Sequence, residues 1–198
     1  MGRRDFLKRT AMVLAAVMAF PLTASAKGGT GRRRVKAPPV VKTELAFSEK
    51  LIRRRMTSMI IIHHAGGPDR DVGAADIHAW HLANKWAGVG YHFIVRKDGT
   101  IEAGRPMDMV GAHCLGANDV SVGICAAGNF ETAKPSAAQL QSVANLTAYL
   151  CDRYDLEPSR RTIVGHRDLC RTECPGNNLY GRLPAIRQGV RRFFADMR

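Results

Sequence analysis

Gly165-His166-Arg167-Asp168-Leu169-Cys170-Arg171-Thr172-Glu173-Cys174-Pro175-Gly176 is the stretch that decides the fold and the chemistry of this chain. It places an imidazole and a thiol eight residues apart, with the hydroxyl of Thr172 two residues before the thiol of Cys174. A pair of imidazoles, His63-His64, ends an apolar run about a hundred residues upstream. Two histidines and one cysteine suit zinc, and three protein ligands leave the fourth tetrahedral position open for water, as in catalytic zinc sites. The sequence therefore predicts a hydrolase with Zn²⁺ as its cofactor.

Residues 1–26 are organised like an export signal. Arg3 and Arg4 open a basic segment, an apolar stretch covers residues 11–20, and Ala24-Ser25-Ala26 forms a small-residue cleavage site. The paired arginines resemble a Tat signal, which predicts cleavage after Ala26 and a periplasmic or secreted protein. An uncleaved anchor is the alternative, but the stretch is shorter than the roughly 20 apolar residues that a membrane span needs. We therefore expect no membrane span after cleavage.

The net charge of +13 is concentrated near the N-terminus. Residues 27–55 contain ten Lys or Arg and two Glu, among glycines and prolines, whereas residues 56–198 carry a net charge of only +2. This composition predicts a flexible basic arm over 27–55 and a single folded domain over 56–198, which we expect to be monomeric. The arm would attract an anionic polymer of the cell envelope. No nucleic-acid partner is expected, because the export signal removes the chain from that partner.

Strands and helices interleave along residues 56–198, which predicts an α/β domain with a mixed central β-sheet flanked by helices. A capping box, Ser136-x-x-Gln139, marks the start of one helix, and Asp98-Gly99 marks a hairpin turn. Strands are expected at 59–63, 91–95, 101–103, 120–126 and 163–164, and helices at 71–86, 136–154 and 184–197.

Several motifs resemble one known family, the zinc-dependent N-acetylmuramoyl-L-alanine amidases, which include the phage amidase lysozymes and the peptidoglycan recognition proteins. The resemblance covers residues 56–185 and implies the fold of that family. It also implies hydrolysis of the amide between N-acetylmuramic acid and L-alanine in peptidoglycan stem peptides, with peptidoglycan or a muropeptide as the partner. The motifs are His63-His64-Ala65-Gly66, Gly88-Val89-Gly90-Tyr91-His92-Phe93-Ile94-Val95, Asp98-Gly99-Thr100, Glu102-Ala103-Gly104-Arg105, Gly165-His166-Arg167-Asp168 and Cys174-Pro175-Gly176.

The resemblance assigns the zinc ligands to His63, His166 and Cys174. His64 competes with His63, because the Ser/Thr-Ala that follows the first ligand in the family is replaced by Ala65-Gly66. Adjacent strand residues point to opposite faces, so only one of the two histidines can easily face the metal. Cys170 is an alternative fourth ligand, although the family has no ligand there.

Tyr91 and Thr172 correspond to the family's catalytic positions. Tyr91 is the family's catalytic tyrosine, and Thr172 stands where phage amidases carry a lysine and active recognition proteins carry a threonine. Some relatives use a glutamate on the central strand as a base, but this chain has Cys125 there. The source of the general base is therefore open.

Weaker expectations concern the rim of the groove. His64, His113, Arg105 and Asn118 are candidates for substrate binding, and His113 is equally compatible with a solvated loop. Cys114 and Cys170 lie in the expected active-site loops and could pair as a disulfide.

A second function remains open at this level, namely a muropeptide-binding module without turnover. Recognition proteins of that kind lack a metal ligand, commonly the cysteine. Because this chain keeps Cys174, the enzyme is favoured.

Overall fold

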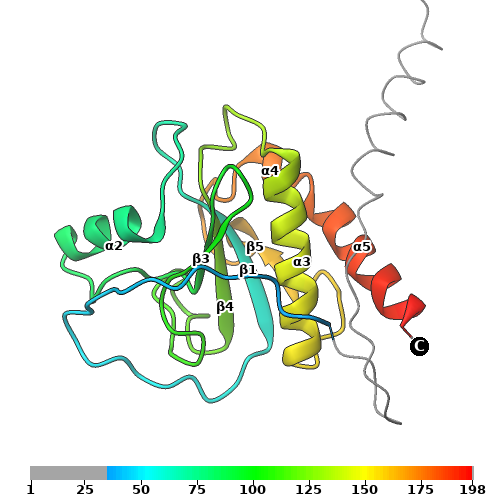
Figure 1. Cartoon of the computed structure of the whole chain (residues 1–198), viewed down its shortest axis with the longest axis horizontal. Coiled ribbons are helices and arrows are strands. Elements are labelled where there is room, and N and C mark those ends of the chain that lie inside the picture. Colours follow the sequence, from blue (N-terminus) through cyan, green and yellow to red (C-terminus); the bar gives the residue numbers. More distant parts are fainter. Residues whose placement is uncertain (1–34, 198) are drawn as a thin grey trace, which may run out of the picture.

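A computed structural model describes residues 35–197 and contains a five-stranded sheet in the order β3-β2-β4-β1-β5. Strand β1 pairs in parallel with both β4 and β5, β2 pairs in parallel with β4, and only β3 is antiparallel to its neighbour β2. The expected α/β class and mixed central sheet are confirmed (Figure 1). The strands are β1 (Met59–His64), β2 (Phe93–Val95), β3 (Ile101–Ala103), β4 (Ser121–Ala126) and β5 (Ile163–Gly165).

The central strand β1 owes its position to its unbroken β-branched run. A parallel strand between two parallel neighbours is covered on both faces, so it reads as a continuous apolar segment rather than an alternating one. Ile60 and Ile62 are fully buried on one face with α3 (Ala137–Arg153) and α5 (Leu183–Asp196). Ile61 is fully buried on the other face, in a smaller cluster with Cys114 and Val164. One face of the sheet is therefore covered by α3 and α5, and the other face by the smaller cluster around Ile61.

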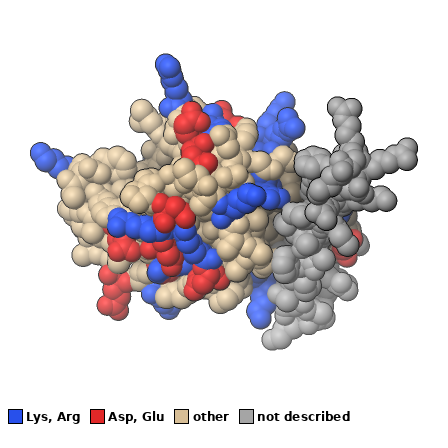
Figure 2. All heavy atoms as spheres, turned by 90° about the horizontal axis from the view of Figure 1, so that it is seen from above, with Lys and Arg blue, Asp and Glu red and all other residues tan. Residues whose placement is uncertain are grey.

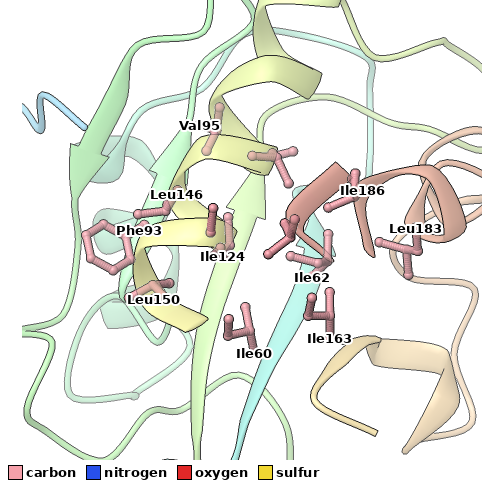
Figure 3. Close-up of a cluster of buried hydrophobic side chains, with 14 of the residues drawn as sticks. Ile60, Ile62, Phe93, Val95, Ile124, Leu146, Leu150, Ile163, Leu183 and Ile186 are labelled. Atoms are coloured by element: carbon pink, nitrogen blue, oxygen red, sulfur yellow. The ribbon is translucent and has the colours of Figure 1, made fainter. Parts of the chain in front are cut away.

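The main core fills the space between the sheet and the helices α3 and α5 (Figures 1 and 3). Figure 3 shows Ile124 near Leu146 and Leu150 of α3, and Ile62 near Ile186 of α5. The opposite face carries α2 (Ala74–Ala83) and long loops (Figure 1). No helix in residues 35–197 has both the length and the apolar character needed to cross a membrane.

The helix ends differ from the expected ranges for identifiable reasons. Helix α2 begins at Ala74 rather than at 71, because the carboxylates of Asp76 and Glu102 accept the N–H groups of Gly73 and Ala74 at 2.8 and 2.6 Å. It ends before Lys85, whose φ of 63° lies in the left-handed region. In α3, Ser136 accepts the N–H of Gln139 at 3.0 Å, which is half of the expected capping box, whereas the Gln139 side chain donates to the carbonyls of Val95 and Ala127 instead of bonding back to Ser136.

The expectation that 27–55 is a flexible arm is wrong from Val35 onward. Val35 is buried against α3, and Val41 exchanges backbone hydrogen bonds with Ile101 and Ala103 of β3 at 2.8 and 2.9 Å. Arg54 is 8 % exposed, and its guanidinium donates to the carbonyl of Met109 at 2.9 Å. A count of charges cannot separate a solvated arginine from one that is buried to satisfy carbonyl groups. The folded domain therefore includes residues 35–55, whereas the signal segment and residues 27–34 lie outside the described residues.

The buried His92 gives the fold a testable pH dependence. Its Nδ1 accepts the N–H of Gly123 at 3.0 Å, and its Nε2 lies 2.9 Å from the carbonyl oxygen of Met109 and 2.8 Å from the guanidinium of Arg54. Burial, followed by the charge of Arg54, lowers the pKa of His92 to about 3. Between about pH 6.5 and pH 3, His92 is therefore protonated in the unfolded chain and neutral in the folded chain. This contribution to stability is complete above pH 6.5 and is lost as the pH falls.

We expect His92 to cost the protein about 2 kcal/mol of unfolding free energy at pH 5 relative to neutral pH. In His92→Asn the amide oxygen can replace the Nδ1 acceptor but does not titrate, so the loss between pH 7 and pH 5 should be smaller than in the parent. Urea unfolding at both pH values measures this difference. Equal losses in parent and variant would contradict the assignment.

Candidate active site

Three side chains from separate segments meet at the carboxyl edge of the sheet. His63 stands near the end of β1, His166 directly follows β5, and Cys174 lies in the loop that continues from His166. One ligand atom of each lies within 4.8 Å of the other two. The carboxyl ends of neighbouring parallel strands lie at one edge of a sheet, and this edge is where α/β proteins usually bind ligands. The parallel pairing of β1 with β5 therefore assembles the expected set.

The alternation along β1 decides which histidine of the pair faces this set. His63 shares its face with Ile61, is fully buried, and has Nδ1 3.6 Å from the sulfur of Cys174. His64 points the other way, where its Nδ1 accepts the N–H of Phe130 at 3.1 Å. The structure thus brings His63 together with His166 and Cys174 and leaves His64 outside the set.

His113 lies beneath His63 rather than on the groove surface. It is 8 % exposed, and its Nδ1 lies 3.0 Å from Nε2 of His63. Neither the solvated-loop interpretation nor direct substrate contact fits this position. A metal ligand needs an unprotonated nitrogen. If Nδ1 of His63 is that nitrogen, Nε2 carries the ring proton and donates a hydrogen bond to Nδ1 of His113. His113 therefore fixes the tautomer and the orientation of His63, as outer-shell partners of metal-binding histidines do.

Two glycines make room for the His113 ring. A Cβ atom on Gly111 would lie 2.5 Å from Cδ2 of His113, and a Cβ on Gly123 would lie 2.7 Å from the same atom. Gly123 belongs to β4, next to the level of Ile61 on β1. Glycine inside a strand is costly and marks a place where another group approaches closely. Gly123 was therefore a sequence signal for a buried side chain over the central strand, although it does not say which one.

We expect His113 to affect metal affinity rather than folding. Loss of an outer-shell partner typically lowers metal affinity about 10–100-fold, so His113→Leu should weaken zinc binding by that factor. In His113→Asn the amide oxygen can take the place of the Nδ1 acceptor and should restore much of the affinity. Competition with a chelating indicator measures both variants. Parental affinity in His113→Leu would show that His63 does not need this partner.

The loop that carries His166 and Cys174 is held by its own side chains. Asp168 accepts the N–H of Gly165 at 2.8 Å, and the N–H of Arg167 donates to the carbonyl of Cys174 at 2.9 Å. The guanidinium of Arg167 forms an ion pair with Glu131 at 2.9 Å. These bonds hold the loop segment that carries the imidazole and the thiol.

Tyr91 and Thr172 both border the set. The rings of Tyr91 and His63 have centroids 5.0 Å apart, and burial raises the pKa of Tyr91 well above its ordinary value. The hydroxyl of Thr172 accepts the N–H of Cys174 at 3.2 Å, which leaves its own proton available for donation. Cys125, opposite His63 on β4, is fully buried, and burial raises its pKa well above the ordinary value. It therefore replaces the carboxylate base with a neutral thiol.

The structure gives Arg105 and Asn118 supporting roles instead of substrate contacts. Arg105 is 6 % exposed and donates to the carbonyls of Val89 and Val110, both at 2.9 Å. The amide oxygen of Asn118 accepts the N–H groups of His113 and Cys114 at 2.8 and 2.9 Å. Both side chains therefore shape the loop under the site. Polar residue type alone did not distinguish this role from binding.

A pocket of about 270 Å³ lies between the loop that follows β1 and helix α2. The loop after β1 forms one wall, and Trp80 of α2 forms another, with the guanidinium of Arg70 4.9 Å from its ring centre. The pocket thus offers an aromatic surface and a cation beside the loop that follows His63 and His64. Its lining residues are Ala65, Gly66, Gly67, Pro68, Arg70, Val72 and Trp80.

This fold is that of the amidase and peptidoglycan-recognition class. The structure is similar to the amidase endolysin LysCS of Clostridium intestinale, with a TM-score of 0.70 and 33% identity over 76% of this chain and 95% of that one. It is also similar to Drosophila PGRP-LB, with a TM-score of 0.65 and 28% identity over 74% of this chain and 93% of that one.

The chain belongs to the N-acetylmuramoyl-L-alanine amidase family, whose family model matches residues 53–177. The endolysin of Klebsiella phage KP32 is 38% identical over 133 residues, which cover 64% of this chain and 85% of the endolysin. The endolysin of Escherichia phage T7 is 35% identical over 133 residues, with the same coverage. The resemblance inferred from the motifs is therefore confirmed.

Proposed function

We propose that this protein is a zinc-dependent amidase that cleaves the bond between N-acetylmuramic acid and L-alanine in peptidoglycan. The observation that carries the proposal is the convergence of His63, His166 and Cys174. Zinc–nitrogen and zinc–sulfur bonds of about 2.0 and 2.3 Å at a tetrahedral angle separate the two ligand atoms by about 3.6 Å. The distance from Nδ1 of His63 to Sγ of Cys174 is 3.6 Å. The residues present therefore fit the ion.

The electrostatics of the set agree with this use. Burial lowers the pKa values of His63 and His166, so both imidazoles are neutral and able to bind a cation at neutral pH. Burial raises the pKa of the Cys174 thiol to about 12, so the thiol must give up its proton when a cation binds. Bound zinc would supply an acidic water molecule and polarise the scissile carbonyl group.

The chain's own residues would then hold the reacting groups. The hydroxyl of Tyr91 keeps its proton because its pKa is raised, so it can donate to the oxygen on which negative charge develops. Thr172 can donate to the same oxygen with its free hydroxyl proton. Both donors border the set from fixed positions, which is the arrangement that favours the transition state over the ground state.

The pocket beside α2 supplies a binding surface for the rest of the substrate. Trp80 offers an apolar face, and Arg70 offers a positive charge to the carboxylates of a stem peptide. On the face shown in Figure 2, acidic and basic side chains are interspersed. The ion pairs Arg96–Asp71 and Lys97–Asp69 are examples of such neighbours in the domain. Attraction to an anionic envelope polymer would draw on the basic segment 27–55, in which six of the ten Lys or Arg residues lie within the described domain. Export to the periplasm by the twin-arginine segment completes the proposal.

Removal of the metal should abolish the activity. Purified sacculi treated with the parent protein should lose turbidity, and dialysis against a strong chelator should stop the loss. One equivalent of zinc per chain should restore it, whereas magnesium should not, because magnesium prefers oxygen ligands. Full activity in protein shown by elemental analysis to hold no metal would end the zinc-dependent account.

A further inference from the structure

A second cluster of side chains that could bind a metal shares His166 with the first, and its two cysteines, Cys114 and Cys170, are not used by the mechanism above. The sulfurs of Cys114 and Cys170 and one ring nitrogen of His166 lie within 4.8 Å of one another. Within residues 35–197 this cluster and the His63–His166–Cys174 set are the two groups of this kind. We propose that Cys114, Cys170 and His166 form a second site for a thiophilic divalent cation, and that its occupation inhibits the enzyme.

The spacing of the two sulfurs suits a shared cation. Two zinc–sulfur bonds of about 2.3 Å at a tetrahedral angle place the sulfurs about 3.8 Å apart. Sγ of Cys114 and Sγ of Cys170 are 3.5 Å apart, so a shift of a few tenths of an ångström admits the ion. Two thiolates and one imidazole form a soft donor set, which selects zinc or cadmium over magnesium and calcium.

Both cysteines are held in place by backbone hydrogen bonds. The N–H of Cys114 donates to the amide oxygen of Asn118 at 2.9 Å. The N–H of Cys170 donates to the carbonyl of His166 at 3.0 Å, which fixes it one short turn after that ligand. Cys114 is 2 % exposed, whereas Cys170 is partly exposed and leaves the pair open to an ion from solvent.

The inhibition follows from the position of His166. This residue contributes a ligand atom to both clusters, so an ion bound between Cys114 and Cys170 draws on an imidazole that the catalytic set also needs. Low concentrations of zinc would activate the protein, and an excess would inhibit it. This consequence rests on the proposed function, whereas the existence of the second site does not.

Cadmium is the direct probe, because cadmium–thiolate bonds absorb in the ultraviolet. The full chain, loaded with one equivalent of zinc and kept reduced by a phosphine, is titrated with Cd²⁺. The parent should show thiolate absorption, and Cys174→Ser should retain part of it. Cys151→Ala should retain all of it, because Cys151 lies in the core between the sheet and α3. In Cys114→Ala and in Cys170→Ala the affinity of the second equivalent should fall at least tenfold.

The inhibition is tested on the same proteins with purified sacculi. Cys170→Ala should hydrolyse sacculi like the parent at one equivalent of zinc and should resist an excess that inhibits the parent. Absorption that depends on Cys174 alone, or equal binding of the second equivalent by the parent and Cys170→Ala, would overturn the second site. If the parent protein is inactive at every zinc level but still shows the absorption of the Cys114–Cys170 thiolates, the result would contradict the proposed function and not the second metal site.

Discussion

Cys174→Ala should lose both its metal and its turnover of peptidoglycan. The variant removes one of the three ligand atoms that converge at the carboxyl edge of the sheet, and the remaining two imidazoles cannot form a site that keeps one position open for water. The loss of zinc affinity should exceed the roughly 10–100-fold that an outer-shell change costs. Elemental analysis and sacculus turbidity measure the two effects.

Two control variants make this result specific. Cys151→Ala removes a buried thiol from the core beneath α3 and should keep zinc and turnover. His64→Ala should also keep the metal, because its ring bonds to the N–H of Phe130 on the other face of β1, whereas His63→Ala should lose it. Zinc retained in Cys174→Ala, or lost in His64→Ala but not in His63→Ala, would contradict the ligand set.

Tyr91→Phe and Thr172→Ala should keep their zinc and lose rate. Removal of one donor to a developing oxyanion costs on the order of 10²–10³ in turnover number, or roughly 2.7–4 kcal/mol. The loss should appear in kcat more than in KM, because the interaction strengthens as charge develops on the oxygen. Tyr91→Phe preserves the ring that packs against His63, so its fold and metal site should be unchanged.

Thr172 needs a matched control, because its hydroxyl also accepts the N–H of Cys174. Thr172→Ser keeps both the acceptor and the donor and should retain most of the turnover, whereas Thr172→Val removes both. Steady-state hydrolysis of soluble muropeptide, together with zinc content, separates the two roles. If Thr172→Ala loses zinc, its hydroxyl supports the ligand loop. If Tyr91→Phe and Thr172→Ala both turn over at the parental rate, neither donates to the transition state.

The sequence predicted the parts of the site that local pattern controls. The β-branched run before His63 and the short segment before His166 gave the two strands, and parallel pairing brought their ends together. The alternation of strand faces limited the metal to one of His63 and His64 but did not say which face holds the site. That choice depends on α3 and α5, which cover the face of Ile60 and Ile62 and leave the face of Ile61 to the metal set.

The sequence could not predict the contacts made by buried polar side chains. His113, Arg105 and Asn118 are polar residues in loops, a pattern that also fits substrate binding. The burial of His113 and Arg105 depends on contacts with His63 and Val89, fifty and sixteen residues away, whereas Asn118 bonds to the backbone of its own loop. Arg54 was assigned to a flexible arm for the same reason, because the carbonyl of Met109 that it satisfies lies more than fifty residues away. The charge of a side chain indicates that its burial is costly, but it does not indicate whether the fold supplies hydrogen-bond partners that offset this cost.

Analysis of the reaction products is the most direct test of the central claim. Sacculi digested by the zinc-loaded parent are separated and weighed by mass spectrometry, with Cys174→Ala as the blank. The account predicts free stem peptides that begin with an L-alanine amine, and glycan strands whose N-acetylmuramic acid carries a free lactyl carboxylate. Fragments in which stem peptides remain attached to muramic acid, with breaks in the glycan or within the peptide instead, would contradict it.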